Sequence, residues 1–198
     1  YMIPGMWGAP LKIINAFPPP MQYSESPYGV GNSQGGNAIS AHEEDGQHLG
    51  PQGILVFHDY DMGMAHAKKI NKPVVLDFTG HACVNCRKME EQVWSAAHVK
   101  NTLANDVVLI SLYVDERIEL PKEQQYETTM AGKTKKVKTT GDKWMVLQAN
   151  SYGTNSQPYY VFLNHDEETL VENANYQDYG TVDLFTDWLG RGLQEFKK

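Results

Sequence analysis

The residues most able to do chemistry are the two cysteines of the chain, Cys83 and Cys86, which form a Cys-x-x-Cys motif. The motif follows the apolar run 73–78, so a buried strand delivers it to the start of a helix. Two residues three positions apart on a helical turn share a face, about 5 to 6 Å apart, a separation that a disulfide can span. The pair therefore predicts a redox centre that opens and closes to transfer two electrons.

We expect the two cysteines to differ in role. Cys83, at the helix start, would face unpaired backbone N–H groups and the positive end of the helix dipole, both of which favour its thiolate. Cys86, one turn further on and less exposed, would attack the mixed disulfide and release the reduced partner. Cys83 is the predicted nucleophile and Cys86 the predicted resolving thiol.

Two alternatives compete with redox chemistry: a metal site and a pair of inert core cysteines. His81 lies close enough in sequence to join Cys83 and Cys86 in a three-ligand site, although a structural zinc site needs four ligands and the chain has no second Cys-x-x-Cys. We predict neither a metal nor a cofactor. Six further histidines show no ligand spacing and are assigned no chemistry: His42, His48, His58, His66, His98 and His165.

Composition limits the classes of partner. The 198 residues are 41% hydrophobic and carry a formal charge of −7, with 17 Lys and Arg against 24 Asp and Glu. This balance argues against nucleic acid as a partner. One basic cluster, comprising Lys133, Lys135, Lys136 and Lys138, is interpreted as the solvated face of a hairpin.

Residues 1–50 are predicted to be a linker and residues 51–198 a folded domain. Seven of the ten prolines lie before Ile54, where Lys12 is the single basic residue, and this composition disfavours regular structure. The apolar start of the chain is too short and too broken by proline and glycine to span a bilayer, and it lacks the pattern of a signal peptide. The first residue is Tyr1 rather than methionine, so we expect a fragment of something longer.

From Ile54 onward the pattern is that of an α/β domain. The unbroken apolar character of 73–79 predicts a strand buried on both faces, as in a parallel sheet with helices on both sides. Asp61 is expected to cap one helix and Ser95 another. The predicted elements are strands at 54–58, 73–79 and 107–114, helices at 61–70, from Cys83, at 96–104, 143–150 and 181–196, a hairpin of 159–163 with 169–172, and a polar insertion at about 116–140 that turns at 131–132.

This order of elements resembles the thioredoxin fold, a mixed central sheet flanked by helices, over residues 54–198. A more specific resemblance is to the C-terminal thioredoxin-like domain of DsbD-type thiol:disulfide interchange proteins, in the form found in Bacteroidetes. It is carried by the tract 74–94 and by 153–158 before the hairpin. Within the first tract the matching features are Val84 directly after the first cysteine, Lys88-Met89-Glu90 and Val93-Trp94.

The resemblance implies a protein-disulfide reductase on the periplasmic face of the bacterial inner membrane. The transmembrane domain of the same protein would donate electrons, and periplasmic thiol proteins, including those serving cytochrome c maturation, would accept them. The linker 1–50 would then connect the last transmembrane helix to this domain. Ala82 stands where many relatives have tryptophan before the first cysteine, which leaves the docking partner less defined than the chemistry.

The resemblance also assigns site residues. Asp77, in the middle of an apolar strand, matches the buried acid of the fold and would exchange a proton with Cys86, unless it is an exposed acid at a strand edge. Glu90 matches the second acid of the family, unless it is a solvated helix residue like Glu91. Pro158 matches the cis-proline facing the disulfide, although most X-Pro bonds are trans. Substrate contacts are expected from Val84, Asn85, Gln157 and Pro158.

Two other functions remain open at this point. One is a redox-inactive or metal-handling binding module that uses His81, Cys83 and Cys86, and the other is a stand-alone disulfide oxidase. The reduction potential separates a reductase from an oxidase, and it depends on a few kcal/mol between the oxidised and reduced forms, which the sequence does not fix.

Overall fold

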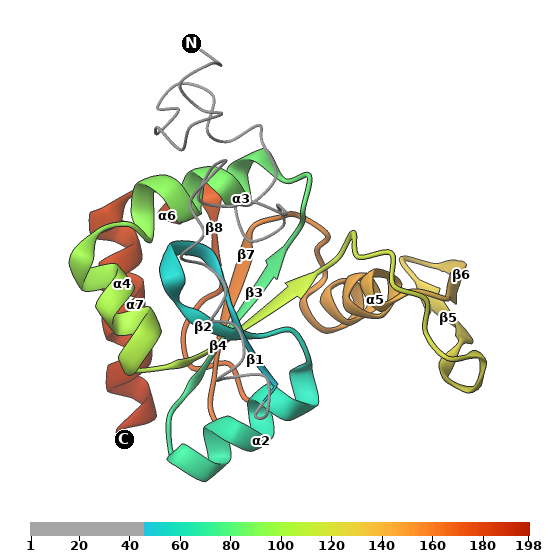
Figure 1. The fold of residues 1–198 in the computed structure, drawn as a ribbon, viewed down its shortest axis with the longest axis horizontal. Helices are drawn as coiled ribbons and strands as arrows, with labels where there is room; N and C mark the ends of the chain where they lie inside the picture. The colour runs from blue at the N-terminus through green and yellow to red at the C-terminus, as the bar shows by residue number, and fades with distance from the viewer. Residues whose placement is uncertain (1–45) are drawn as a thin grey trace, which may run out of the picture.

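A six-stranded mixed sheet forms the centre of the fold in the computed structural model, which describes residues 46–198 (Figure 1). Its spatial order is β1-β2-β4-β3-β7-β8. The strands pair in parallel between β2 and β4 and between β4 and β3, and antiparallel at the other junctions. Their bounds are β1 Gln47–Leu49, β2 Leu55–Phe57, β3 Val74–Thr79, β4 Val108–Tyr113, β7 Tyr159–Leu163 and β8 Ala174–Asn175. The predicted α/β class with a mixed sheet is confirmed.

Helices cover both faces of this sheet, as the continuous apolar character of β3 predicts. Alternate residues of a strand point to opposite faces, so Val75 joins one core and Leu76 and Phe78 join the other. The first core lies under the π-helical segment that follows α3, under α4 and under α7, and the second lies under α2 and α5. The helices are α2 Tyr60–Ile70, α3 Val84–Lys88, α4 Ala97–Asn105, α5 Thr140–Tyr152, α6 Tyr176–Tyr179 and α7 Val182–Phe196, and α3 continues into a π-helical segment, Met89–Val93.

The amphipathic helix predicted at 181–196 is confirmed as α7. Its inner face buries Phe185, Trp188 and Leu189, and the Trp188 ring meets Phe162 of β7 edge-on at 5.5 Å between centroids. Gly192 allows this close packing, because a Cβ there would lie 2.3 Å from Phe162 Cδ2. The helix is thereby fixed across β7, the strand that follows Pro158.

Both predicted helix caps are wrong by one or two positions. Asp59 is the N-cap of α2, and its Oδ1 accepts a hydrogen bond of 2.9 Å from the backbone N–H of Met62, whereas Asp61 lies inside the first turn. Ala96 is at the N-cap position of α4, and the hydroxyl of Ser95 donates instead to the Glu91 carbonyl. The preceding π-helical segment supplies that carbonyl, so the serine closes the end of one helix rather than the start of the next.

The second strand of the C-terminal hairpin is also displaced from 169–172. Thr169 forms a single bridge to Leu163, and the strand proper, β8, pairs with the start of β7 at Tyr159 and Tyr160. Between them, the backbone N–H of Leu170 donates to the Phe162 carbonyl, and Glu172 pairs with Arg191 of α7. The regular strand pairing therefore falls at Ala174–Asn175 rather than at 169–172.

The sheet begins earlier than the predicted domain boundary. β1 lies within the stretch 1–50 that we expected to be linker, and it pairs antiparallel with β2 in the register Gln47–Phe57 to Leu49–Leu55. The remainder of the predicted linker, 1–45, lies outside the described residues. Among residues 46–198, no helix is both long and apolar enough to cross a membrane.

The polar insertion forms the predicted hairpin, β5 Tyr126–Met130 with β6 Lys133–Val137. Its turn residues Ala131 and Gly132 have φ of 49° and 76°, the conformation that suits the right-handed twist of a two-residue hairpin. The hairpin packs beside α5 and extends away from the central sheet (Figure 1). Lys135 and Lys136 of the basic cluster pair with Asp142 and Glu127, so these two lysines bind acids of this same region.

Candidate active site

Cys83 and Cys86 are joined in a disulfide, with their Cα atoms 5.3 Å apart. Cys83 is the N-cap residue of α3, and its Sγ accepts a hydrogen bond of 3.2 Å from the backbone N–H of Cys86. Cys83 is partly exposed, whereas Cys86 is 1% exposed. The predicted pairing is confirmed, and the sulfur that a partner can reach is that of Cys83, at the positive end of the helix.

The turn that leads into Cys83 is held by Asp115, a residue that the sequence reasoning missed. Its carboxylate accepts a hydrogen bond of 2.9 Å from the backbone N–H of His81 and one of 3.1 Å from that of Ala82. Asp115 follows β4, whose last residue Tyr113 lies opposite Thr79 at the end of β3. The available signal in the sequence was an acid just after the strand that became β4. Parallel strands end at the same edge of a sheet, so this acid lies near the end of β3, where the Cys-x-x-Cys motif begins.

We expect Asp115→Ala to lower the free energy of unfolding of the oxidised protein by about 1 kcal/mol, because two backbone N–H groups lose a charged acceptor that water only partly replaces. Urea denaturation monitored by circular dichroism measures this. Asp106→Ala, which removes an exposed carboxylate at the end of α4, is the matched control and should change stability little. Equal stabilities for the Asp115 variant and this control would show that the carboxylate does not hold the turn.

The side chain of His81 contacts Tyr113 and Glu116 and is not part of a metal-binding group among the residues that the structure describes. Its ring stacks on Tyr113 at 4.2 Å between centroids, and its Nε2 lies 3.1 Å from Glu116 Oε2. Partial burial acts to raise the pKa of Glu116, but hydrogen bonds from His81 and from the backbone of Arg117 outweigh it, and the pKa is lowered. Within residues 46–198, no three His, Cys, Asp or Glu side chains are grouped to hold a metal ion, and that includes the alternative site of His81 with the two cysteines.

Asp77 is buried in the centre of the sheet, with 2% exposure, so the alternative of an exposed acid at a strand edge is wrong. The Ser111 hydroxyl, from the paired position of β4, donates to Asp77 Oδ2 at 3.0 Å. Burial raises the pKa of Asp77 to about 7, against the opposing effects of the Ser111 hydrogen bond and the charge of Arg87. The carboxyl group can therefore gain and lose a proton near neutral pH.

Glu90 is also buried, with 5% exposure, which excludes the alternative of a solvated helix residue. Burial raises its pKa to about 8, while Arg87 opposes the rise and the charge of Asp77 adds to it. Glu91, the next residue, is exposed. The π-helical segment that follows α3 thus places one of two adjacent glutamates inside the protein and the other in solvent.

Arg87 pairs with Glu90 and its charge also acts on Asp77, and the sequence reasoning did not identify it. The residue is 3% exposed, and its Nη1 lies 2.7 Å from Glu90 Oε2. Its Nη2 donates to Thr79 Oγ1 at 3.3 Å and to the Gly80 carbonyl at 3.4 Å. Its spacing of three residues before Glu90, directly after Cys86, was the available signal.

The predicted cis peptide bond between Gln157 and Pro158 is confirmed. Tyr159, the next residue, pairs with Phe78 of β3, so Pro158 lies at the end of the sheet where the chain leaves toward Cys83. The Gln157 side chain donates to Gln148 Oε1 at 2.9 Å and to the Asn155 carbonyl at 2.8 Å, which fixes the loop before β7.

The predicted substrate contacts of Gln157, Pro158, Val84 and Asn85 stay predictions. Asn85 is exposed in the first turn of α3 and Val84 is partly exposed, whereas Pro158 is buried.

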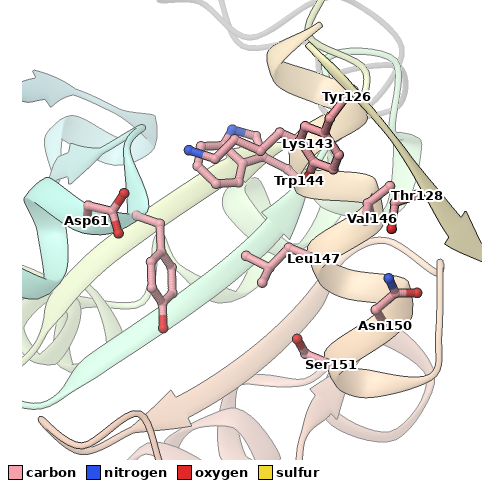
Figure 2. Close-up of a pocket in the computed structure, with 10 residues that line it drawn as sticks. Asp61, Tyr126, Thr128, Lys143, Trp144, Val146, Leu147, Asn150 and Ser151 are labelled. Carbon is pink, nitrogen blue, oxygen red and sulfur yellow. The ribbon is translucent and has the colours of Figure 1, made fainter. Parts of the chain in front are cut away.

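A separate pocket of about 360 Å³ lies between the N-terminus of α2, the β5–β6 hairpin and α5. Figure 2 shows Lys143 extended across the Trp144 ring at its rim, and the amino group lies 4.4 Å from the ring centroid. Neither cysteine lines this pocket. The cysteine chemistry and this hollow therefore occupy different parts of the domain.

Comparison with known proteins agrees with this geometry. A family model described as "Thioredoxin-like domain" matches residues 60–178. A solved structure titled "DsbH Oxidoreductase" is similar in fold with a TM-score of 0.50 and 20% sequence identity, over 69% of this chain and 82% of that one. No curated protein matches.

Proposed function

The chain belongs to the thioredoxin-like domain family, and from this premise we propose that it is a thiol:disulfide oxidoreductase that works as a protein-disulfide reductase. The observation that carries the proposal is the asymmetry of the disulfide. Cys83 is reachable at the start of α3, while Cys86 is buried and lies four residues before Glu90, a buried acid on the same continuous helical stretch that is paired with Arg87. An attacking thiol needs access, and a resolving thiol needs a proton acceptor.

In the reducing direction, the Cys83 thiolate attacks one sulfur of a partner disulfide. A bond forms between Cys83 and that sulfur, and the other partner sulfur leaves as a thiolate that takes up a proton. Cys86 then loses its proton and attacks Cys83, the Cys83–Cys86 bond forms, and the second partner thiol is released. Two electrons pass to the partner, and the protein returns to the disulfide form.

The buried acids favour the reducing direction. A strongly oxidising Cys-x-x-Cys protein owes its potential to a stabilised thiolate in the reduced form. Here two carboxyl groups near the motif would oppose a further negative charge, and a single guanidinium lies among them. The reduced form therefore gains little from thiolate stabilisation.

We further propose a DsbD-type role. In that role a transmembrane domain of the same protein donates electrons to this domain on the periplasmic face of the inner membrane, and periplasmic thiol proteins accept them. Support comes from the resemblance of the tracts 74–94 and 153–158 to that family. A redox-inactive or metal-handling module has less support, because among the described residues the cysteines are bonded to each other and no metal-ligand group is assembled.

Equilibration with glutathione buffers tests the direction of electron flow. We expect a reduction potential near that of thioredoxin, about −270 mV, measured by alkylating the free thiols at each ratio of reduced to oxidised glutathione. A potential near about −120 mV, typical of the strong oxidant DsbA, would contradict the reductase and favour the disulfide oxidase. A chain that stays in one form across all buffers would favour the redox-inactive module.

A further inference from the structure

Arg87 is an unusual residue for the interior of a small domain. Arginine is almost never fully buried unless it is paired, and here its side chain is 4% exposed while that of its partner Glu90 is 7% exposed. The guanidinium spans two elements, because it reaches Glu90 on the π-helical segment and the Thr79–Gly80 corner at the end of β3. These contacts hold the guanidinium between the π-helical segment and the end of β3, the strand that leads to Cys83.

The cluster around Arg87 holds two acids and one base. The charge of Arg87 acts on Asp77 from β3, on Glu90 from the π-helical segment and on Tyr160 from β7. Glu91 adds a smaller negative effect on Glu90. Tyr160 stays neutral, because burial and the two acids raise its pKa well above the ordinary value. When one of the two carboxyl groups is ionised, its charge balances that of Arg87.

We propose that Arg87 is a positioning residue for the thiol chemistry: its buried guanidinium keeps one of the two acids, Asp77 or Glu90, ionised near neutral pH and so leaves a proton acceptor for Cys86. This role rests on the proposed function in its last step. There the proton of the Cys86 thiol passes to the ionised carboxylate, the Cys86 sulfur bonds to Cys83, and the bond from Cys83 to the partner breaks. The departing partner thiolate takes a proton from solvent.

The charge of Arg87 is needed because burial alone would protonate both acids. Desolvation is the largest influence on each carboxyl group, and Arg87 opposes it at both. A cation within a few ångströms lowers a carboxyl pKa by roughly one to three units. Without Arg87, both acids would therefore carry protons at neutral pH, and neither could accept one from Cys86.

Carboxyl titration in the oxidised protein tests this directly, because the disulfide removes the thiols from the titration. Asp and Glu are labelled with ¹³C at the side-chain carboxyl, and the resonances of Asp77 and Glu90 are assigned with Asp77→Asn and Glu90→Gln. We expect Arg87→Met to move both midpoints up by about one pH unit or more, and Arg87→Lys to restore most of the shift. Midpoints unchanged in folded Arg87→Met would overturn the proposal.

A second pair of variants keeps the test valid if Arg87→Met fails to fold. Glu90→Gln and the double variant Arg87→Met/Glu90→Gln differ in the guanidinium alone, and the double variant removes both members of the buried ion pair. The Asp77 midpoint should be higher in the double variant. Coinciding midpoints would refute an electrostatic role for Arg87.

Kinetics then connect the cluster to Cys86. The rate of mixed-disulfide resolution is followed against pH with a small aromatic disulfide as substrate. As the pH is lowered, this rate should fall at a higher pH in Arg87→Met than in wild type, and Arg87→Lys should restore the profile. An unchanged profile would contradict the role of Arg87 in resolution. The two measurements test different statements. If the carboxyl pKa values shift in Arg87→Met but the wild-type chain does not reduce disulfides, the effect of the Arg87 charge stands and the reductase function is rejected.

Discussion

Cys86→Ser is expected to accumulate a covalent complex with a partner protein, whereas Cys83→Ser is expected to form none. Cys83 is the sulfur that a partner can reach, and Cys86, at 1% exposure, is placed to attack only after the mixed disulfide has formed. Removing Cys86 leaves that intermediate without its intramolecular resolving thiol. Both variants should lose reductase turnover by several orders of magnitude, since the two sulfurs act as one unit.

Non-reducing electrophoresis followed by mass spectrometry measures the trapping, with an insulin-type disulfide protein as the partner. The double variant Cys83→Ser/Cys86→Ser is the matched control for adventitious oxidation. Trapping by Cys83→Ser at the level of Cys86→Ser would reverse the assignment of nucleophile and resolving thiol. Trapping by neither variant would reject disulfide exchange through this motif.

Asp77→Asn is expected to stabilise the oxidised protein more at pH 8 than at pH 5, by about 2 to 3 kcal/mol. The folded-state pKa of Asp77 is raised from 3.8 to about 7 because the carboxyl group is buried. Asparagine cannot ionise, and its carbonyl oxygen can still accept the hydrogen bond that Ser111 donates to Asp77 Oδ2. The variant should therefore avoid the cost that wild type incurs as the buried carboxylate loses its proton.

The sign follows from linkage. Below pH 4 the acid is protonated in both the folded and the unfolded state. Between about pH 4 and 7 the folded state binds a proton that the unfolded state has lost, so the free energy of unfolding falls as pH rises, by up to about 1.36 kcal/mol per unit. From pH 5 to the folded pKa near 7 this amounts to roughly 2.7 kcal/mol. The pKa of Glu90 is also raised, so this residue lowers the free energy of unfolding with rising pH in both wild type and Asp77→Asn.

Urea denaturation at pH 5, 6, 7 and 8, with the disulfide intact, measures the difference between variant and wild type. Glu172→Gln is the control, because ion pairing with Arg191 lowers the pKa of that exposed acid to about 2. Its effect should be nearly constant from pH 5 to pH 8, since Glu172 is ionised in the folded state throughout. A stability difference for Asp77→Asn that does not change with pH would show that Asp77 stays ionised in the folded protein.

The sequence by itself determined the chemistry and most of its framework. Cys83 and Cys86 are neighbours along one helix turn, so their pairing needs no knowledge of distant contacts, and 5.3 Å between their Cα atoms is what that spacing predicts. Asp77 could be singled out because an acid inside an apolar strand must be buried or misplaced. Pro158 could be assigned as cis from its place before the hairpin, by resemblance to the fold. Each of these conclusions depends on residues close to one another in the chain or on the order of elements.

The tertiary structure alone decided the partners of these groups. Ser111 meets Asp77 across 34 residues because β4 returns parallel to β3, and Asp115 reaches the turn before Cys83 from the end of the same strand. The spacing of Arg87 three residues before Glu90 indicates a possible pair, but spacing alone does not separate a buried arginine from a solvated one. Its burial results from the packing of α3 over the end of β3. Local patterns report on backbone preference and amphipathicity, whereas charge pairing inside a core depends on which strands become neighbours, and that is fixed only when the whole sheet assembles.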